Sequence, residues 1–577
     1  MTIRTAAVLL IATASAMLAH PATALALQTQ DAQAETPPGV EAAIQQLLDD
    51  PRAALETAVQ ARDAQVAAWP MADTDALVRA VEHHAIVAMI AGLPPSGRGM
   101  LTDVWASHPG FVAAIARVYT PSNDGATVAI QALSIANQQG DSLESYAELA
   151  AAVCVVLDRP HEFPALGSVL PSAEGVFEAL VYAHEDRRVT ALPLDELPAE
   201  LLVHLTDFAL TGEGIREIIQ DRRATDPHEL YDDVPFVQPG LLSGEAAPGP
   251  EDFGFDRIVE RGGAGPIRTF YAEQLGQSFG WPVSIATGRL AQERFQAPVF
   301  LESDRRGYAW SLEAIPDHPG VALGTTTHPV TGQAVPLSHL VLTADLARAG
   351  VEPTREAWAL LRASQHAPDG VRQALLTAAR SRTVGFIELW RDQLESQLQQ
   401  AGAEADGVQR VLAEFLQQID RISPLLGTEL VLEQIGSMGE ARGDLLEWMA
   451  LTSRRDPHRV AAVGLAIGDA ALARGDRAAA ESAYEDVLNR HIDETPLALD
   501  ALARLKSLLD QDGTDLDRIG LYARTHRRLR APRASDEAMV RASAFMIVGE
   551  QYERLLRDAG REREAERLRR QLDRALP

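Results

Sequence analysis

Apolar residues return every three or four positions through both ends of this 577-residue chain, but not through its middle. Near the start, Val40, Ile44 and Leu47 show this spacing. Such a period places apolar side chains along one face of a helix. The sequence therefore predicts short amphipathic helices over residues 37–159 and again over residues 351–577.

The middle of the chain, residues 160–350, has a different texture, with more aromatic residues, proline and glycine. Short apolar or β-branched runs appear at Val283–Ala286 and Pro298–Leu301, and runs of this kind predict strands. Residues 238–252 are rich in glycine, proline and alanine without any period, which predicts a surface loop or linker. The expected fold class is mainly α with a central α+β domain.

Two segments of the C-terminal region resemble the helical hairpins of tetratricopeptide repeats. One lies near residues 461–490 and is hinged at Gly475–Asp476, with Tyr484 spaced to pack against the first helix. A weaker one lies near residues 549–572 and is hinged at Ala559–Gly560. Because each hairpin of such an array needs neighbours to bury its apolar face, two units predict a helical-hairpin tail rather than a full repeat array.

The first 26 residues have the pattern of a secretory signal peptide. Arg4 supplies a basic start, Thr5–Ala19 is almost wholly apolar or small, and Ala24–Ala26 offers a small-x-small cleavage site. A second such site at Ala32–Ala34 leaves the mature start open. The apolar run is too short to span a bilayer, and no later run is long enough. We expect an exported chain, periplasmic or extracellular, without an integral membrane segment.

The charge and cysteine content exclude several classes of partner and site. The formal net charge is -29, and an acidic chain of this kind disfavours nucleic acid and anionic lipid as main partners. The single cysteine, Cys154, excludes an intrachain disulfide and every multi-cysteine metal site. We expect no cofactor and no metal, and a protein or peptide as the partner.

One stretch of the middle region carries a recognisable order of turns, helix and strand. The glycine-rich turn Gly262–Gly265 precedes a helical run at residues 267–279, which is followed by Gly280–Pro282 and an apolar run from Val283. This order resembles the transglutaminase-like core of papain-like cysteine enzymes. In that family a Gly-Gly-x-Cys turn opens a helix, and a Gly-Ile-Pro-Ala-type turn and a strand follow. The resemblance covers about residues 145–345 and implies a helix layered on a sheet.

The same resemblance identifies a degenerate catalytic cleft. The family's cysteine maps onto Gly265, or onto a residue one place away, and its His-Ala-Trp histidine maps onto Tyr308, two residues before Trp310. Glycine carries no nucleophile, and a tyrosine of ordinary pKa is a poor base at neutral pH. Glu313 and Asp317 are both candidates for the acidic third member. These five residues form the expected vestigial cleft, and no catalytic residue is assigned.

Other reactive groups have simpler explanations. Cys154 lies in an apolar helical run, where a thiol is typically buried and inert. His83 and His84 are neighbours on a predicted helix, so they point in different directions and cannot bind one metal ion together. His328 is isolated in the sequence.

Three functions follow from this sequence. The first is an exported, non-catalytic scaffold or peptide-binding protein, because the turn-forming glycine and proline residues remain while the catalytic pair is replaced. The second is a hydrolase of peptide or cell-wall amides that uses acids such as Glu313 or Asp317. It predicts a carboxylate of raised pKa pointing into an open pocket with Tyr308. The third is a purely structural helical-repeat protein, without a helix layered on a sheet in the middle region.

Overall fold

The computed structural model describes most of the chain between residues 40 and 576. The described part has gaps at residues 70, 72, 164–166, 186–191, 222–226, 228–229, 231–232, 235–264, 291–292, 306, 312–323, 403–404 and 532–542. The expected signal peptide, the expected loop at 238–252, and Glu313 and Asp317 all lie outside the described residues.

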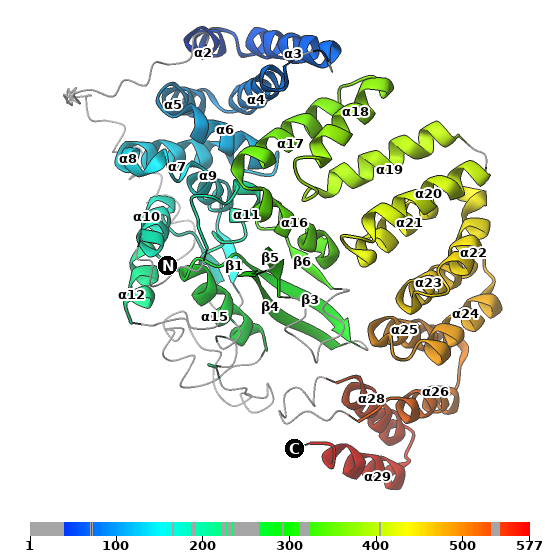
Figure 1. Cartoon of the computed structure of the whole chain (residues 1–577). Coiled ribbons are helices and arrows are strands. Elements are labelled where there is room, and N and C mark those ends of the chain that lie inside the picture. Colours follow the sequence, from blue (N-terminus) through cyan, green and yellow to red (C-terminus); the bar gives the residue numbers. More distant parts are fainter. Residues whose placement is uncertain are drawn as a thin grey trace.

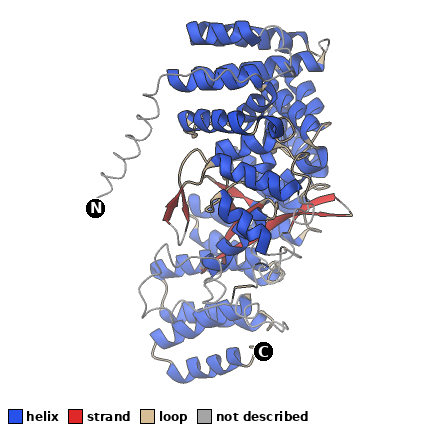
Figure 2. Cartoon of the chain, turned by 90° about the vertical axis from the view of Figure 1, so that its left-hand side faces the viewer, coloured by secondary structure: helices blue, strands red, loops and turns tan. Residues whose placement is uncertain are grey.

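The described chain is mainly helical, with its strands gathered in one small region (Figure 1). In Figure 2 helices lie above and below these strands. The C-terminal helices, from α17 to α29, follow an arc around the sheet (Figure 1). The mainly helical fold class is therefore confirmed, with strands only in the middle of the described chain. None of the described helices combines the length and the apolarity needed to cross a membrane.

Eight helices of the described chain precede the first strand. They are α2 (Val40–Asp49), α3 (Pro51–Ala68), α4 (Thr74–Ala91), α5 (Pro95–Ser107), α6 (Pro109–Val118), α7 (Gly125–Gln138), α8 (Gly140–Leu143) and α9 (Ala147–Val156). Local signals start several of them. Asp50 caps α3 by accepting hydrogen bonds from the N–H groups of Arg52 and Ala53, with Pro51 in the first position. In α9 every residue from Leu149 to Val156 is buried, which places this helix in the middle of the core.

The central region combines helices, a short hairpin and a five-stranded sheet. Its described elements are β1 (His161–Phe163), β2 (Gly167–Val169), α10 (Ala173–Glu185), α11 (Ala199–Leu202), α12 (Gly212–Asp221), α15 (Gly265–Ser278), β3 (Val283–Leu290), β4 (Glu293–Asp304), β5 (Gly307–Trp310), β6 (Thr325–Thr327), β7 (Ala334–Pro336) and α16 (Leu337–Ala349). The sheet order is β5-β4-β3-β6-β7, and every pairing is antiparallel. Antiparallel order fits strands joined in sequence by short turns.

Helix α15 packs directly on strands β3 and β4 of this sheet. They approach closely at Gly276, where a Cβ atom would lie 2.8 Å from the Phe300 ring and 2.9 Å from Val283. Only glycine therefore fits this position without a shift of the neighbouring side chains. Helix layered on sheet is the arrangement that the resemblance in the sequence implies.

The N-terminal helices and the central region share one hydrophobic core. Its buried residues run from Leu47 to Ala347 without a break near residue 159. A buried charge cluster crosses the same boundary, because Arg117 on α6 forms ion pairs with Glu148 on α9 and with Glu200 on α11. The change of composition near residue 160 therefore marks a change from helices to mixed helices and strands within one hydrophobic core.

The rest of the chain is a series of consecutive helices. They are α17 (Val351–Ser364), α18 (Asp369–Arg380), α19 (Ile387–Ala401), α20 (Ala405–Ile419), α21 (Pro424–Ser437), η5 (Gly439–Ala441), α22 (Arg442–Thr452), α23 (Pro457–Ala473), α24 (Arg477–Arg490), α25 (Thr495–Asp512), α26 (Asp515–Arg528), α28 (Ala544–Asp558) and α29 (Glu562–Asp573). Helices adjacent in sequence pack together along most of this arc.

The two segments expected as tail hairpins each fall on two consecutive helices, α23 with α24 and α28 with α29. Gly475 joins α23 to α24 with a φ of 79°, and Gly560 joins α28 to α29 with a φ of 72°. Such positive angles favour glycine. Tyr484 packs against Gly468 of the preceding helix, and its hydroxyl donates to Asp469 at 2.7 Å. The arc contains more helix pairs than the sequence indicated, because the pairs share packing without sharing a sequence repeat.

Candidate functional site

The residues expected in the vestigial cleft lie on two elements of the central region. Gly265 begins α15, while Tyr308 and Trp310 lie on the edge strand β5. Glu313 and Asp317 lie outside the described residues, so the acidic third member of the expected cleft stays a prediction.

The direction of α15 along strand β4 fixes where Gly265 lies. Near the helix start, the Thr269 hydroxyl donates to the carbonyl of Gln296 at 3.3 Å. Near the helix end, Gly276 meets the ring of Phe300. The helix and the strand therefore run in the same direction, and Gly265 lies beyond the Gln296 end.

Tyr308 lies toward the other end of this helix. It pairs with Ser303 of β4, which is seven residues further along the strand than Gln296, from 296 to 303. At about 3.3 Å per residue this separation is roughly 20 Å. The structure therefore does not bring Gly265 and Tyr308 to one cleft, although both belong to the layered helix and sheet.

Tyr308 and Trp310 have structural contacts of their own. The Arg348 guanidinium donates to the Tyr308 carbonyl at 2.5 Å, and burial raises the pKa of the Tyr308 phenol. Trp310 is buried, and its indole N–H donates to the Thr343 hydroxyl at 3.0 Å. A phenol of raised pKa forms even less phenolate at neutral pH than free tyrosine, so Tyr308 is poorly suited to act as a general base.

Cys154 lies in the core, as the apolar run predicted. Its side chain is completely buried in α9, and burial raises the pKa of its thiol. Because the thiolate is the nucleophilic form, this thiol is inert in the folded protein. The expectation that Cys154 fills core space is confirmed.

A cavity lies between α15, the sheet and two loops. Its volume is about 520 Å³, within the usual range for small-ligand sites. It is lined by Arg159, Pro160, Asp207, Thr269, Phe270, Glu273, Val283, Ser284, Ile285, Thr287, Gln296, Thr326, Thr327, His328, Pro329, Thr331 and Gly332. We call this cavity the central pocket. Of the residues expected in the vestigial cleft whose side chains the structure describes, neither Tyr308 nor Trp310 lines it.

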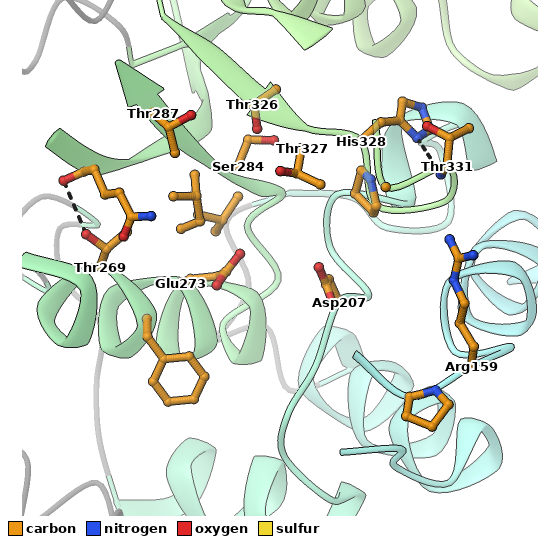
Figure 3. Close-up of a pocket in the computed structure, with 17 residues that line it drawn as sticks. Arg159, Asp207, Thr269, Glu273, Ser284, Thr287, Thr326, Thr327, His328 and Thr331 are labelled. Carbon is orange, nitrogen blue, oxygen red and sulfur yellow. Dashed lines mark hydrogen bonds between the residues drawn. The ribbon is translucent and has the colours of Figure 1, made fainter. Parts of the chain in front are cut away.

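Two carboxylates point into the central pocket. Glu273 comes from α15 and Asp207 from the segment after α11, and their carboxylates face the same space, across from Ser284 and Thr327 (Figure 3). Burial, and then the charge of Asp207, raise the pKa of Glu273 well above its usual range. One carboxyl of the pair therefore keeps a proton at pH values where a solvated glutamate has lost it.

Buried amides on α15 hold the Asp207 segment in place. The Gln274 side chain accepts from the N–H of Ala209 at 2.7 Å and donates to the Asp207 carbonyl at 3.1 Å. Gln277 donates to the carbonyl of His204 at 3.3 Å. These bonds explain why polar residues occupy the buried face of α15, and they fix Asp207 beside Glu273.

Thr326 places an unpartnered hydroxyl at the wall of the central pocket. The residue is 3% exposed, and its Oγ1 has no hydrogen-bond partner among the described residues. A buried hydroxyl without a partner costs free energy, and native proteins rarely leave one so. Among the described residues, the hydrogen-bonding capacity of this hydroxyl is therefore unused.

Two histidines lie together near the pocket, and one of them, His328, lines it. The rings of His204 and His328 are 5.9 Å apart, and the Ser284 hydroxyl lies 2.9 Å from Nδ1 of His204. The His328 Nδ1 accepts from the N–H of Val330 at 3.2 Å, which leaves Nε2 as the protonated nitrogen of the neutral ring. Burial lowers the pKa of both rings, that of His204 to about 3. The pocket histidines are therefore neutral at physiological pH.

The sequence alone did not group these residues into one site. His328 is isolated in the sequence, but the fold places it beside His204. Glu273 shares a helix face with Thr269, four residues earlier, yet no motif marks it. Asp207, Glu273 and Thr326 come from three distant segments, so spacing along the chain could not group them.

The described lining of the central pocket consists mainly of hydrogen-bonding groups. Within the described ranges, no three His, Cys, Asp or Glu side chains gather closely enough to bind one ion. Its two carboxylates, neutral imidazoles and hydroxyls are instead suited to hydrogen bonding and to proton exchange.

Comparisons with protein-family models, curated proteins and solved structures found no match for this chain. The transglutaminase-like and tetratricopeptide-like resemblances therefore stand on motif order alone.

Proposed function

We propose that this chain is an exported, non-catalytic binding protein whose central pocket takes a peptide or a peptide-derived group. The observation that carries the proposal is the buried Thr326 hydroxyl, which has no partner among the described residues and lies at the wall of an open pocket. A bound peptide offers both N–H donors and carbonyl acceptors, so it can satisfy this hydroxyl.

The surroundings of the pocket support binding of a polar chain segment. Ser284 and Thr327 face the two carboxylates (Figure 3), and Gln296 adds an amide to the lining of the pocket. Hydroxyls and amides can both donate and accept, which suits the alternating groups of a peptide backbone. The arc of helices beyond α17 offers an additional surface on which a protein partner can be held.

Thiol chemistry does not fit the residues near this pocket. The only cysteine, Cys154, is buried in the core, and the helix that would present the family nucleophile begins at Gly265. A non-catalytic role explains how the protein keeps the layered helix and sheet without those groups. The purely structural interpretation required that this layering be absent, so the packing of α15 on the sheet disfavours it.

A peptide array tests the proposal directly. The purified mature chain is applied to immobilised hexapeptides of varied sequence, beside Thr326→Val and the control Thr102→Val, whose hydroxyl lies buried in α5 away from the pocket. We expect the wild type and Thr102→Val to retain one class of peptide, and Thr326→Val to retain it at least about fivefold less. Absence of retention by the wild type, or equal retention by Thr326→Val, would contradict peptide binding in this pocket.

A hydrolase that uses carboxylates is the second candidate, and Glu273 is the observation that favours it. A carboxyl of raised pKa beside a second carboxyl is a common arrangement for general acid and base catalysis. An amidase assay on the same peptides decides between the two. Hydrolysis by the wild type that disappears in Glu273→Gln, but persists in the exposed control Glu213→Gln, would replace the binding protein by an enzyme.

A further inference from the structure

A second cavity lies where the N-terminal helices meet the start of the arc, away from the central pocket. Its volume is about 160 Å³. Arg62 and His84 line it from α3 and α4, while Trp358, Arg362, Gln365 and His366 line it from α17 and the turn after it. We call it the basic cavity, because its charged and titratable lining residues are two arginines and two histidines.

Arg62 is the buried member of this set. The residue is 6% exposed, and its guanidinium forms an ion pair with Asp63 through Nε at 2.9 Å and Nη2 at 2.7 Å. Its Nη1 lies 3.3 Å from Nε2 of His84. Asp63 therefore binds Nε and Nη2 of Arg62, while Nη1 is directed toward His84 and the cavity.

The other groups converge on the same space from α17. The guanidinium carbon of Arg362 lies 5.7 Å from the centre of the Trp358 ring, and the ring of His366 lies 6.4 Å from that of His84. This arrangement fixes a second guanidinium at the rim through a cation–π contact. A cluster of this sign is unusual in a chain with a formal net charge of -29.

Positive charge already acts on both histidines. Burial, then Arg62 and then His366, lower the pKa of His84 to about 4, and burial and Arg62 lower the pKa of His366. The charged or titratable groups that act on the pair are Arg62, Asp63, His83 and Arg362. Asp63 is the one acid of this set. Without a ligand, the two imidazoles therefore stay neutral beside two fixed cations.

We propose that the basic cavity binds a small tetrahedral oxyanion of sulfate or phosphate size. Guanidinium forks match the oxygen edges of such an anion, and indole and imidazole rings close the sides. A volume of about 160 Å³ holds one such anion with a few waters, but not a nucleotide. An anion between the helices also offsets the repulsion between Arg62, Arg362 and any protonated histidine.

Binding here would tie together segments that are far apart in the sequence. Helices α4 and α17 are already joined beside the cavity by the ion pair of Glu82 with Arg355. An anion held by Arg62 and Arg362 adds a second bridge between the N-terminal helices and the arc. Because a ligand that binds only the folded state stabilises it, anion binding should raise the melting temperature.

Calorimetric titration of the mature chain with sodium sulfate tests this site. Sulfate keeps its charge between pH 5.5 and 7.5, so a change of affinity reports on the protein alone. Sodium chloride at the same ionic strength controls for screening, and sodium phosphate at pH 7.5 asks whether that anion occupies the same site. We expect one saturable sulfate site, at least about threefold tighter at pH 5.5, because the anion favours the protonated histidines.

Variants locate the site. Arg362→Gln should weaken sulfate binding about tenfold, since it removes an exposed guanidinium at the rim without opening the core. Arg410→Gln, on the exposed face of α20, should leave it unchanged. His366→Gln should reduce the difference between the two pH values. Equal heats from chloride, undiminished binding by Arg362→Gln, or affinity that does not change with pH would each overturn the proposal.

Discussion

At the scale of single residues, the Thr326 hydroxyl makes a stability prediction. Replacing it by valine keeps the shape but removes a buried group that has no partner among the described residues. We expect Thr326→Val to raise the free energy of unfolding of the unliganded protein by about 1 kcal/mol. Thr102→Val should lower it, because the Thr102 hydroxyl donates to the Arg98 and Gly99 carbonyls. Urea titration of both variants measures the difference, and a loss of stability in Thr326→Val would show that the hydroxyl is satisfied.

Glu273 makes a prediction about pH. Burial and the charge of Asp207 raise the pKa of its carboxyl above the ordinary value of 4.5. A folded-state pKa above the unfolded one gives a contribution to stability that is full below about pH 4.5 and is lost as the pH rises through the folded pKa. Relative to wild type, Glu273→Gln should therefore gain stability as the pH rises above 4.5. Unfolding curves from pH 4 to 8 measure this gain, with Glu213→Gln as the exposed control, and parallel curves would contradict the raised pKa.

The candidate site shows how far single residues could be predicted. The inert Cys154 followed from its apolar neighbours, because those neighbours are also its packing partners. The pair of Glu273 and Asp207 could not be predicted, because a carboxyl gains a raised pKa only when the fold removes water and brings a second charge near. The expected pairing of Gly265 with Tyr308 failed because motif order does not fix the position along a strand.

At the scale of elements, the separation of Gly265 from Tyr308 predicts the outcome of a restoration experiment. Gly265→Cys combined with Tyr308→His places a thiol at the start of α15 and an imidazole on β5, roughly 20 Å apart by strand geometry. General-base activation needs the two groups within hydrogen-bond reach. We expect no thiol-dependent amidase activity from the double variant. Activity above that of the two single variants would show that the two elements approach each other in solution.

The helix pair of α23 and α24 gives a second prediction at this scale. A Cβ on Gly468 would lie 2.3 Å from the Tyr484 ring, so Gly468→Ala should destabilise the pair by about 1–3 kcal/mol. The control Gly443→Ala in α22 has no atom within 4 Å of the new methyl group, and it should gain from the higher helix propensity of alanine. Chemical denaturation followed by circular dichroism compares them, and equal stability of the two variants would contradict the close packing.

Structural elements could be predicted where a local requirement of the backbone leaves a signal in the sequence. The hinge glycines of the tail were found because a positive φ is a local requirement of the backbone. The remaining pairs of the arc were missed because any complementary apolar side chains can pack two helices, and a common sequence is not needed.

At the scale of the whole molecule, the buried side chains form separate hydrophobic clusters. The limits of these clusters do not coincide with the changes of composition near residues 160 and 350. One core extends from Leu47 to Ala347, whereas a separate cluster covers Ala461 to Val548 in the tail. All seven tryptophans precede residue 449, so tryptophan fluorescence reports on the first core and on the arc as far as α22, while circular dichroism reports on every helix.

Arg117 tests this division. Its side chain is 2% exposed and forms ion pairs with Glu148 and Glu200, so Arg117→Met leaves two carboxylates without their buried partner and should cost about 3–5 kcal/mol. We expect its fluorescence and dichroism transitions both to move to lower urea concentration. Gly468→Ala should move the dichroism transition further than the fluorescence transition, because no tryptophan lies beyond α22. Arg52→Met, which breaks an exposed ion pair, should move neither. If Gly468→Ala shifts the fluorescence as far as Arg117→Met does, the tail and the central body unfold as one unit, and the separation of the two cores has no thermodynamic counterpart.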